Sequence, residues 1–119
     1  MKIPLSRRLE AACRFVKPQD RVADIGCDHG YLGIYLLKNN LASFVYACDI
    51  NEGPLNAAVF NAEKFGVRDK MQFYLSDGVK NTPRDFDCLV CAGMGGDTMI
   101  SILESAPWIK DSKYRMILQ

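Results

Sequence analysis

Carboxylates and glycines in the first half of the sequence have the types and spacing of a nucleotide-binding site. Residues 24–30 read DIGCDHG, and Asp49 follows Gly26 by 23 positions. Glycines allow a tight turn after a strand, and a carboxylate about 20 residues further on accepts hydrogen bonds from ribose hydroxyls. This spacing predicts a ligand that contains a nucleoside.

The charge of this loop discriminates between nucleotide ligands. A dinucleotide places its pyrophosphate at the N-terminus of the following helix, where Asp28 would repel it. S-adenosylmethionine has no phosphate but carries an ammonium and a sulfonium cation, which Asp24 and Asp28 attract. No G-x-x-x-x-G-K-[ST] segment is present, so a P-loop is excluded. We therefore predict that the loop binds S-adenosylmethionine.

Further candidate residues follow the other predicted strands. Asp77 and Gly78 end a strand at the place where an adenine ring would lie, and a Gly-Met-Gly-Gly turn at 93–96 lines the other side of the crevice. The predicted cofactor-binding residues are Asp24, Gly26, Cys27, Gly30, Asp49, Ile50, Asn51, Asp77, Gly78, Gly93, Met94 and Gly95.

Each of these residues also has a simpler interpretation. Asp24 could bond only to nearby backbone amides, and Asp28 could cap the next helix. His29 could face solvent, while Asp49 and the 93–96 turn could be ordinary turn residues. Their agreement on one edge of one predicted sheet favours the binding site.

Strands and helices alternate along the chain and would bring these residues together. Continuous apolar strands in this alternation predict an α/β, Rossmann-like doubly wound parallel sheet, with strand order 3-2-1-4-5. Ligands bind where the order reverses, between the first and fourth strands. The predicted strands are 21–26, 43–50, 71–78, 85–93 and 114–119, and the predicted helices run from Ser6 to Pro18 and over 30–40, 52–66 and 97–107.

Composition limits the class of protein. The chain has 119 residues, which is one domain at most, and a net charge of +1, which makes no general electrostatic case for nucleic acid or membrane. No apolar run approaches the roughly 20 residues needed to span a bilayer. The first fifteen residues carry charges throughout and lack an apolar signal core. We expect a cytoplasmic protein.

The five cysteines predict buried thiols. An odd number without high density argues against a disulfide framework. Cys88 and Cys91 form a C-x-x-C, but they lie in a predicted strand, where residues three apart point to opposite faces. A shared metal or redox site there is therefore not expected, and no metal is predicted.

Five motifs occur in order along the chain: L-S-x-R-L at 5–9, DIGCDHGYL at 24–32, D-x-N-x-G-P-L at 49–55, SDG at 76–78 and AGMGG at 92–96. Together they resemble the bacterial tRNA (adenine(22)-N1)-methyltransferases over essentially the whole chain. The resemblance implies a class I methyltransferase that uses S-adenosylmethionine to methylate N1 of an adenine in tRNA.

The resemblance also implies missing parts. The chain stops at Gln119, on the predicted fifth strand, whereas family members continue through further strands and a C-terminal helical domain. We expect residues 1–119 to be the N-terminal part of a class I methyltransferase domain, truncated after the fifth strand. Family loops usually have Ser or Thr at Cys27, often Ala at Gly30, and commonly Pro at Gly33; these departures are mild.

Methylation at N1 leaves the adenine ring cationic, so a nearby carboxylate would stabilise it or accept a proton from N6. Asp28 is the leading catalytic candidate, with His29 as alternative or partner. Tyr31 would stack on or orient the base, or else pack on the sheet. Arg8 would contact tRNA phosphate or the methionine carboxylate of the cofactor, or else be a solvated helix charge.

Three other functions remain open from the sequence. The chain could methylate a protein or small molecule on the same fold. It could be a nicotinamide-dependent oxidoreductase, which Asp28 disfavours. It could also bind the cofactor or a partner without catalysis, since part of the domain is expected to be missing.

Overall fold

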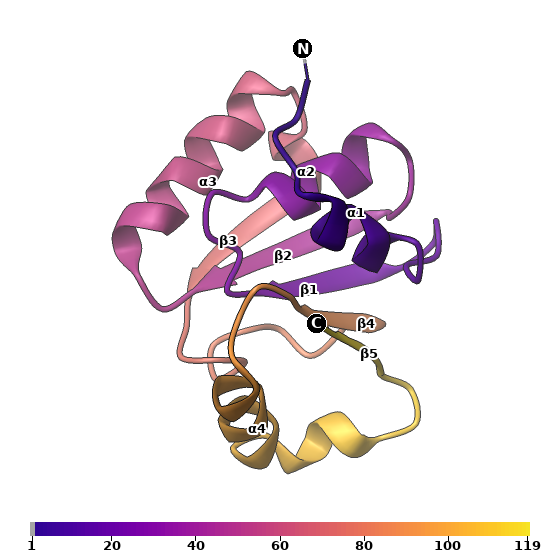
Figure 1. Ribbon diagram of the computed structural model, residues 1–119, viewed down its shortest axis with the longest axis vertical. Helices are drawn as coiled ribbons and strands as arrows, with labels where there is room; N and C mark the ends of the chain where they lie inside the picture. The colour runs from indigo at the N-terminus through magenta and orange to yellow at the C-terminus, as the bar shows by residue number, and fades with distance from the viewer. Residues whose placement is uncertain (1) are drawn as a thin grey trace.

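The computed structural model describes residues 2–119, which form a single parallel sheet with helices on both faces (Figure 1). Neighbouring strands are all parallel, and their order is β3-β2-β1-β4-β5, as predicted. The order therefore reverses between β1 and β4. The strands are β1 (Arg21–Ile25), β2 (Phe44–Asp49), β3 (Met71–Leu75), β4 (Cys88–Cys91) and β5 (Arg115–Leu118).

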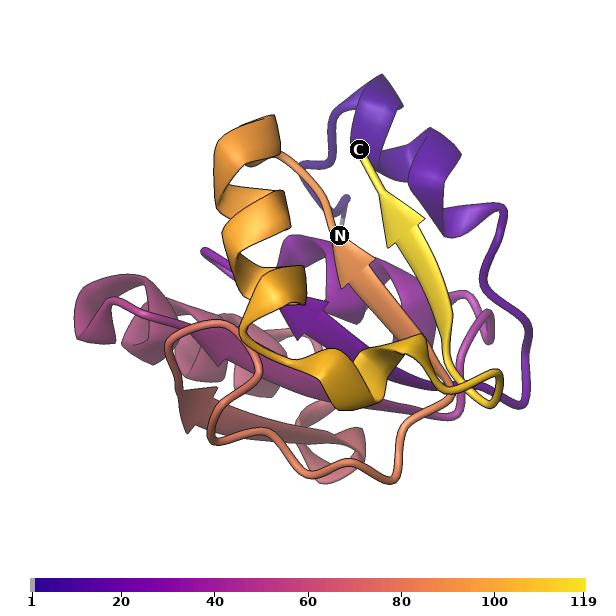
Figure 2. The same cartoon turned by 90° about the horizontal axis from the view of Figure 1, so that it is seen from below.

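The helices divide between the two faces of the sheet. One face carries the first three α-helices, and the other carries the fourth with a short 3-10 helix (Figures 1 and 2). The helices are α1 (Arg7–Cys13), α2 (Tyr31–Lys38), α3 (Glu52–Lys64) and α4 (Gly96–Glu104), with 3-10 turns η1 (Arg68–Lys70) and η2 (Pro107–Lys110). None of the helices in residues 2–119 has the length and apolar character needed to cross a membrane.

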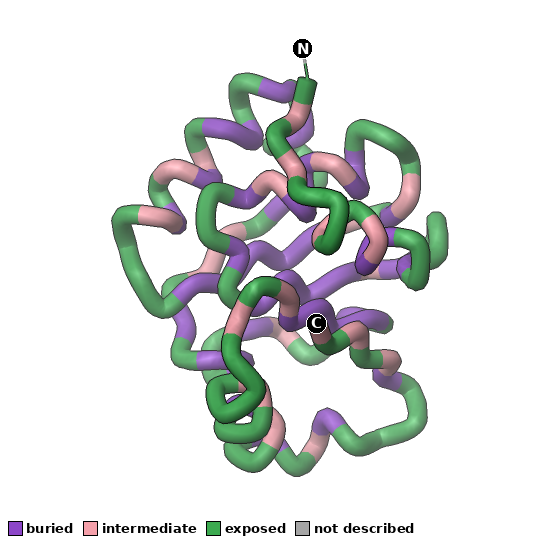
Figure 3. Tube along the Cα trace, in the orientation of Figure 1, coloured by how far each residue is buried: buried purple, intermediate pink, exposed green. Residues whose placement is uncertain are grey.

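Side-chain alternation along the strands builds two separate cores. Val22 and Cys88 pack with α1, α2 and α3, whereas Ala23 and Leu89 pack with α4 and η2. The central strands β1, β2 and β4 are buried except for the first residue of β1 and of β2 (Figure 3). Cys88 and Cys91 fall into different cores, so the two thiols face opposite sides of the sheet, as the strand periodicity predicts. All five thiols are free and buried.

The first helix is shorter than predicted. Ser6 caps it as expected, because Ser6 Oγ accepts a hydrogen bond from Leu9 N at 3.2 Å. The helix then ends at Cys13 instead of continuing to Pro18. The cause is tertiary: Asp20 Oδ2 accepts the N–H of Lys17 at 2.8 Å, and the same carboxylate pairs with Arg115 on β5. This contact diverts the chain into the loop before β1.

All five strands are shorter than predicted, and β3 and β4 differ most. β3 ends at Leu75 because Ser76 Oγ donates to Gly78 O at 2.8 Å and accepts from Asn81 N at 3.0 Å, which turns the chain away from the sheet. β4 pairs with β1 only over Cys88–Cys91. The remaining predicted residues at the carboxyl ends of these strands are consequently in loops, where they are free to line a site.

Candidate functional site

Two cavities lie at the carboxyl ends of the strands, at the reversal of strand order. They lie on opposite sides of Gly26, which lines both. The larger cavity, of about 280 Å³, is on the α1 side and is lined by Pro4, Leu5, Leu9, Asp24, Gly26, Cys27, Asp28, His29, Tyr31, Leu32, Ala92 and Gly93. The smaller cavity, of about 100 Å³, is on the α4 side and is lined by Ile25, Gly26, Asp49, Ile50, Ser76, Gly78, Met94, Thr98 and Ile102.

Gly26 is the point where the two cavities meet, and a larger residue would be strained there. Its φ of +72° lies in the left-handed region, which strains any residue with a Cβ. A Cβ placed there would also lie 2.7 Å from Met94 Cε. Met94 therefore packs directly over the backbone of the loop, and a ligand that extends from one cavity to the other must pass along Gly26.

Asp24 is a buried carboxylate with an unsatisfied oxygen. The residue is 3% exposed, and its Oδ2 has no hydrogen-bond partner among the described residues. Burial, together with the nearby negative charge of Asp49, raises the pKa of Asp24 to about 7. Buried polar atoms in folded proteins normally have a partner. An orphaned carboxylate oxygen on a cavity wall indicates a place for a cation or hydrogen-bond donor from a ligand.

Asp49 holds two loops in place. Its Oδ2 accepts a hydrogen bond from Asp28 N at 2.9 Å, and its Oδ1 accepts one from Asn51 N at 2.9 Å. The first bond fixes the loop after β1, and the second fixes the start of α3. A carboxylate has about four lone-pair positions, so Asp49 retains capacity to accept from a ligand in the smaller cavity.

Asp28 and His29 form an exposed pair on the wall of the larger cavity. His29 Nδ1 lies 2.9 Å from Asp28 Oδ1, and both side chains are more than half exposed. Asp28 has a φ of +51° and does not cap the helix, because Gly30 occupies the N-cap position. The capping interpretation of Asp28 is therefore wrong, and its side chain is free to act on a ligand.

Tyr31 and the N-terminal segment complete the larger cavity. The Tyr31 ring centroid is 6.0 Å from that of His29, and Tyr31 also packs against the core under α1, as its packing interpretation predicts. Pro4, Leu5 and Leu9 form an apolar wall opposite. Their part in the site was missed from the sequence, where Leu5 and Leu9 appeared only in the L-S-x-R-L motif at 5–9.

Asn61 is a second residue that the sequence did not single out. It lies on α3, is 8% exposed, and its Nδ2 donates to His29 O at 2.9 Å. This bond ties the loop carrying Asp28 and His29 to a helix 32 residues away. The sequence feature that could have identified Asn61 is its polar side chain on the same buried face of α3 as the apolar residues Ala58 and Ala62.

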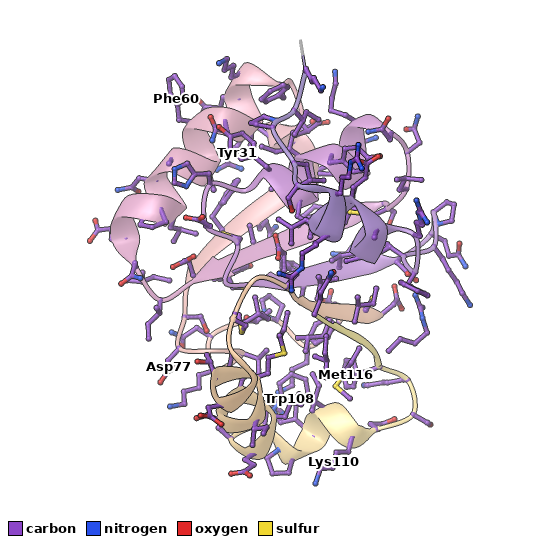
Figure 4. The ribbon with its side chains drawn as sticks, viewed as in Figure 1. Tyr31, Phe60, Asp77, Trp108, Lys110 and Met116 are labelled. Carbon is purple, nitrogen blue, oxygen red and sulfur yellow. The ribbon has the colours of Figure 1, made fainter. Side chains whose placement is uncertain are left out.

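Some predicted residues lie outside both cavities. Asp77 is exposed and pairs with Lys80 at 3.0 Å, and Figure 4 shows it well away from Tyr31. Arg8 is exposed and lines neither cavity. Gly95 is the N-cap residue of α4. Gly30 is needed for packing, because a Cβ there would lie 2.9 Å from Ala58 Cβ.

The remaining predicted residues have clear positions. Gly78 and Ile50 line the smaller cavity, and Gly93 lines the larger one. Cys27 lines the larger cavity, and burial raises the pKa of its thiol, which keeps it protonated. Within residues 2–119 no group of three or more His, Cys, Asp or Glu side chains is placed to hold a metal ion.

Comparisons with known proteins show which family this chain belongs to. The family described as "Methyltransferase domain" matches residues 5–119. The chain is 34% identical, over 99% of its length, to the tRNA (adenine(22)-N(1))-methyltransferase of Bacillus subtilis (strain 168), and it covers 50% of that protein.

Solved structures agree with this match. The M. capricolum protein TrmK, solved with S-adenosyl-homocysteine, is 37% identical with a TM-score of 0.81; the match covers 92% of this chain and 49% of that one. Sp1610 of Streptococcus pneumoniae, a putative tRNA (m1A22) methyltransferase solved with S-adenosyl-L-methionine, is 33% identical with a TM-score of 0.89, covering 97% and 55%. The chain thus spans about half the length of these relatives. By its sequence and its fold, the chain belongs to the methyltransferase domain family.

Proposed function

We propose that this chain is the N-terminal, cofactor-binding part of a class I methyltransferase domain that transfers a methyl group from S-adenosylmethionine to N1 of adenine 22 in tRNA. The observation that carries the cofactor assignment is the orphaned oxygen of Asp24 on the wall of the larger cavity. The tRNA substrate is supported by the similarity to the tRNA (adenine(22)-N(1))-methyltransferase of Bacillus subtilis. The cytoplasm is the proposed location of the protein.

The residues present fit S-adenosylmethionine. Asp24 would accept the methionine ammonium in the larger cavity, where Asp28 adds negative charge. Asp49 would accept from the ribose hydroxyls, since it lines the smaller cavity with lone pairs to spare. Ile50 is 62% exposed, so its apolar surface is available to the adenine ring. Cys27, Gly30, Asn51 and Gly95 would shape the surrounding backbone, and Asp77 and Gly78 would flank the adenine edge.

The acceptor base would enter the larger cavity between Tyr31 and the apolar wall of the N-terminal segment. S-adenosylmethionine supplies the electrophilic methyl group. The lone pair of adenine N1 forms the new N–C bond as the sulfonium–methyl bond breaks, and the adenine ring becomes cationic. Asp28 would stabilise that charge or accept the N6 proton, with His29 held beside it at 2.9 Å.

Arg8 is proposed to contact the tRNA. It is exposed and lies outside both cavities, which favours a phosphate on the RNA over the methionine carboxylate. Base pairing in tRNA would require the target adenine to be flipped out of its helix, or reached where pairing is weak.

Calorimetric titration tests the cofactor assignment directly. S-adenosylmethionine and S-adenosylhomocysteine should bind the chain, and NAD should not. Asp24→Asn keeps the shape of the side chain but removes its charge, so affinity for S-adenosylmethionine should fall at least tenfold. Asp69→Asn, a surface carboxylate on η1, is the matched control and should bind normally. Equal affinity for NAD, or wild-type affinity in Asp24→Asn, would refute the assignment.

The acceptor assignment needs a separate assay on the full-length protein. Transcripts of tRNA with adenine or guanine at position 22 are methylated, digested and analysed by mass spectrometry. N1-methyladenosine should form only in the adenine transcript. Methylation of both transcripts, or of neither while the cofactor binds, would show that the acceptor is something else.

A further inference from the structure

A second groove adjoins the larger cavity on the surface between the N-terminal segment and α2. Its volume is about 610 Å³, and its lining includes Lys2, Leu5, Arg7, Glu10, Tyr35 and Lys38. Leu5 lines both this groove and the larger cavity, so the two hollows share a wall. We call this surface the N-terminal groove.

The groove concentrates positive charge. Lys2, Arg7 and Lys38 contribute three cations, and none forms an ion pair within residues 2–119. Glu10 is the only acidic residue of the lining, and its Oε1 accepts a hydrogen bond from Tyr35 OH at 3.3 Å. The lining therefore carries a net charge of two positive units.

This local charge contrasts with the rest of the molecule. The whole chain has a net charge of only +1, and several cations elsewhere are paired: Lys80 with Asp77, Arg21 with Asp85 and Arg115 with Asp20. Like charges collected in a concave surface raise the local potential and attract anions. The gathering of three cations around one concave surface thus marks the groove as a place for a polyanion.

The position of the groove beside the larger cavity indicates which polyanion it binds. A base that occupies the larger cavity must be attached to a backbone that leaves it on either side, and the groove begins at the shared wall of Leu5. Positively charged grooves that follow a backbone next to a base pocket are the usual way to hold a flipped or single-stranded nucleotide. Phosphate contacts of this kind set the register of the base without reading its sequence.

We propose that the N-terminal groove binds the phosphodiester backbone of the RNA next to the acceptor nucleotide, through Lys2, Arg7 and Lys38. This inference rests on the proposed function, because it takes the larger cavity to be the acceptor site. If so, residues 2–119 contact the RNA at a surface that is separate from the cofactor-binding residues.

Steady-state methylation of tRNA by the full-length protein tests the groove. The double variant Arg7→Gln/Lys38→Gln should raise KM for tRNA at least tenfold, with kcat within about twofold and S-adenosylmethionine affinity unchanged. Each phosphate contact on a single strand contributes about 0.7 to the slope of log affinity against log salt, so losing two should flatten the slope by about 1.4. Lys2→Gln lies before the first helix, so it tests the groove without risk to a helix.

The matched control is Lys70→Gln/Lys110→Gln, which removes the same charge from other surfaces; Figure 4 shows Lys110 at the far end of the molecule from Tyr31. Its KM and salt slope should equal those of the wild type. An unchanged KM and slope in both groove variants, with methylation intact, would overturn the inference. Groove variants that instead lose binding to anionic lipid vesicles but keep tRNA affinity would overturn it in favour of a membrane. Absence of tRNA methylation in the wild type would refute the proposed function instead.

Discussion

The carboxylate of Asp49, at the end of β2, accepts the backbone N–H of Asp28, in the loop after β1, at 2.9 Å. The residue proposed to bind the ribose therefore also positions the residue proposed to act on the acceptor base. Cofactor binding and catalytic geometry consequently depend on the same side chain, which a mutational test has to separate.

Asp49→Ala should lower both stability and cofactor affinity. Each hydrogen bond to a charged acceptor contributes about 1.5–3 kcal/mol, and Asp49 makes two to backbone amides, so we expect a loss of roughly 3–6 kcal/mol in the free energy of unfolding. Urea denaturation measures this, with Asp69→Ala as the surface control.

Asp49→Asn separates the two roles of that residue. It keeps one acceptor oxygen, so it should recover part of the stability while binding S-adenosylmethionine more weakly than the wild type. Wild-type cofactor affinity in a folded Asp49→Ala protein would contradict the ribose role.

Asp24 should make stability depend on pH. Its pKa is raised from 3.8 to about 7 in the folded protein, so between these values the folded state binds more protons than the unfolded state. Stability should therefore fall as pH rises from about 4 to 7, by up to a few kcal/mol at roughly 1.4 kcal/mol per pKa unit. Asp24→Asn should remove this dependence and be the more stable protein at pH 8.

The same group should make cofactor affinity rise with pH. A cationic ligand binds the ionised carboxylate, so affinity for S-adenosylmethionine should increase through pH 7 in the wild type and much less in Asp24→Asn. Denaturation and calorimetry at pH 5.5 and pH 8 check both effects. A wild-type stability that rises over this interval as much as that of Asp24→Asn would contradict the assignment.

Asp28→Asn should impair turnover and leave cofactor binding almost intact. Asn tolerates the left-handed backbone of this position, where φ is +51°, so the loop should keep its shape. We expect the single-turnover rate of tRNA methylation by the full-length protein to fall roughly 10²-fold or more, which is the usual size of a general acid–base contribution. S-adenosylmethionine affinity should change less than threefold, because the Asp28 side chain is 73% exposed and solvent screens its charge. An unchanged single-turnover rate would remove Asp28 from the chemistry.

Gly26→Ala should disturb the meeting point of the two cavities. The left-handed φ of +72° costs a residue with a Cβ about 1–2 kcal/mol, and the contact with Met94 Cε adds to this. The double variant Gly26→Ala/Met94→Ala relieves the contact but not the backbone strain. It should therefore be less destabilised than the sum of the two single variants. Urea denaturation of the four proteins measures the coupling, and strict additivity would show that Met94 does not press on residue 26.

Local sequence patterns determined the framework of this protein. Apolar runs of strand length alternating with helical segments predicted the parallel sheet and its order, because burial on both faces leaves a continuous apolar strand. The same reasoning predicted that Cys88 and Cys91 face opposite sides. It also brought the residues that follow β1, β2 and β4 to one edge, since the carboxyl ends of parallel strands meet there.

Only the tertiary structure decided what those residues do to one another. Asp28 could equally have been a helix cap until the structure placed Gly30 at the N-cap of α2, and only the structure shows Asp49, 21 positions away, holding the Asp28 amide. Asn61 reaches His29 across 32 residues, and the loop at Asp20 is closed by Arg115, 95 positions later. Periodicity records which face of an element is buried, but such bonds depend on how packed elements are aligned in space. For the same reason the orphaned oxygen of Asp24 and the unpaired cations of the N-terminal groove became visible only once the chain was folded.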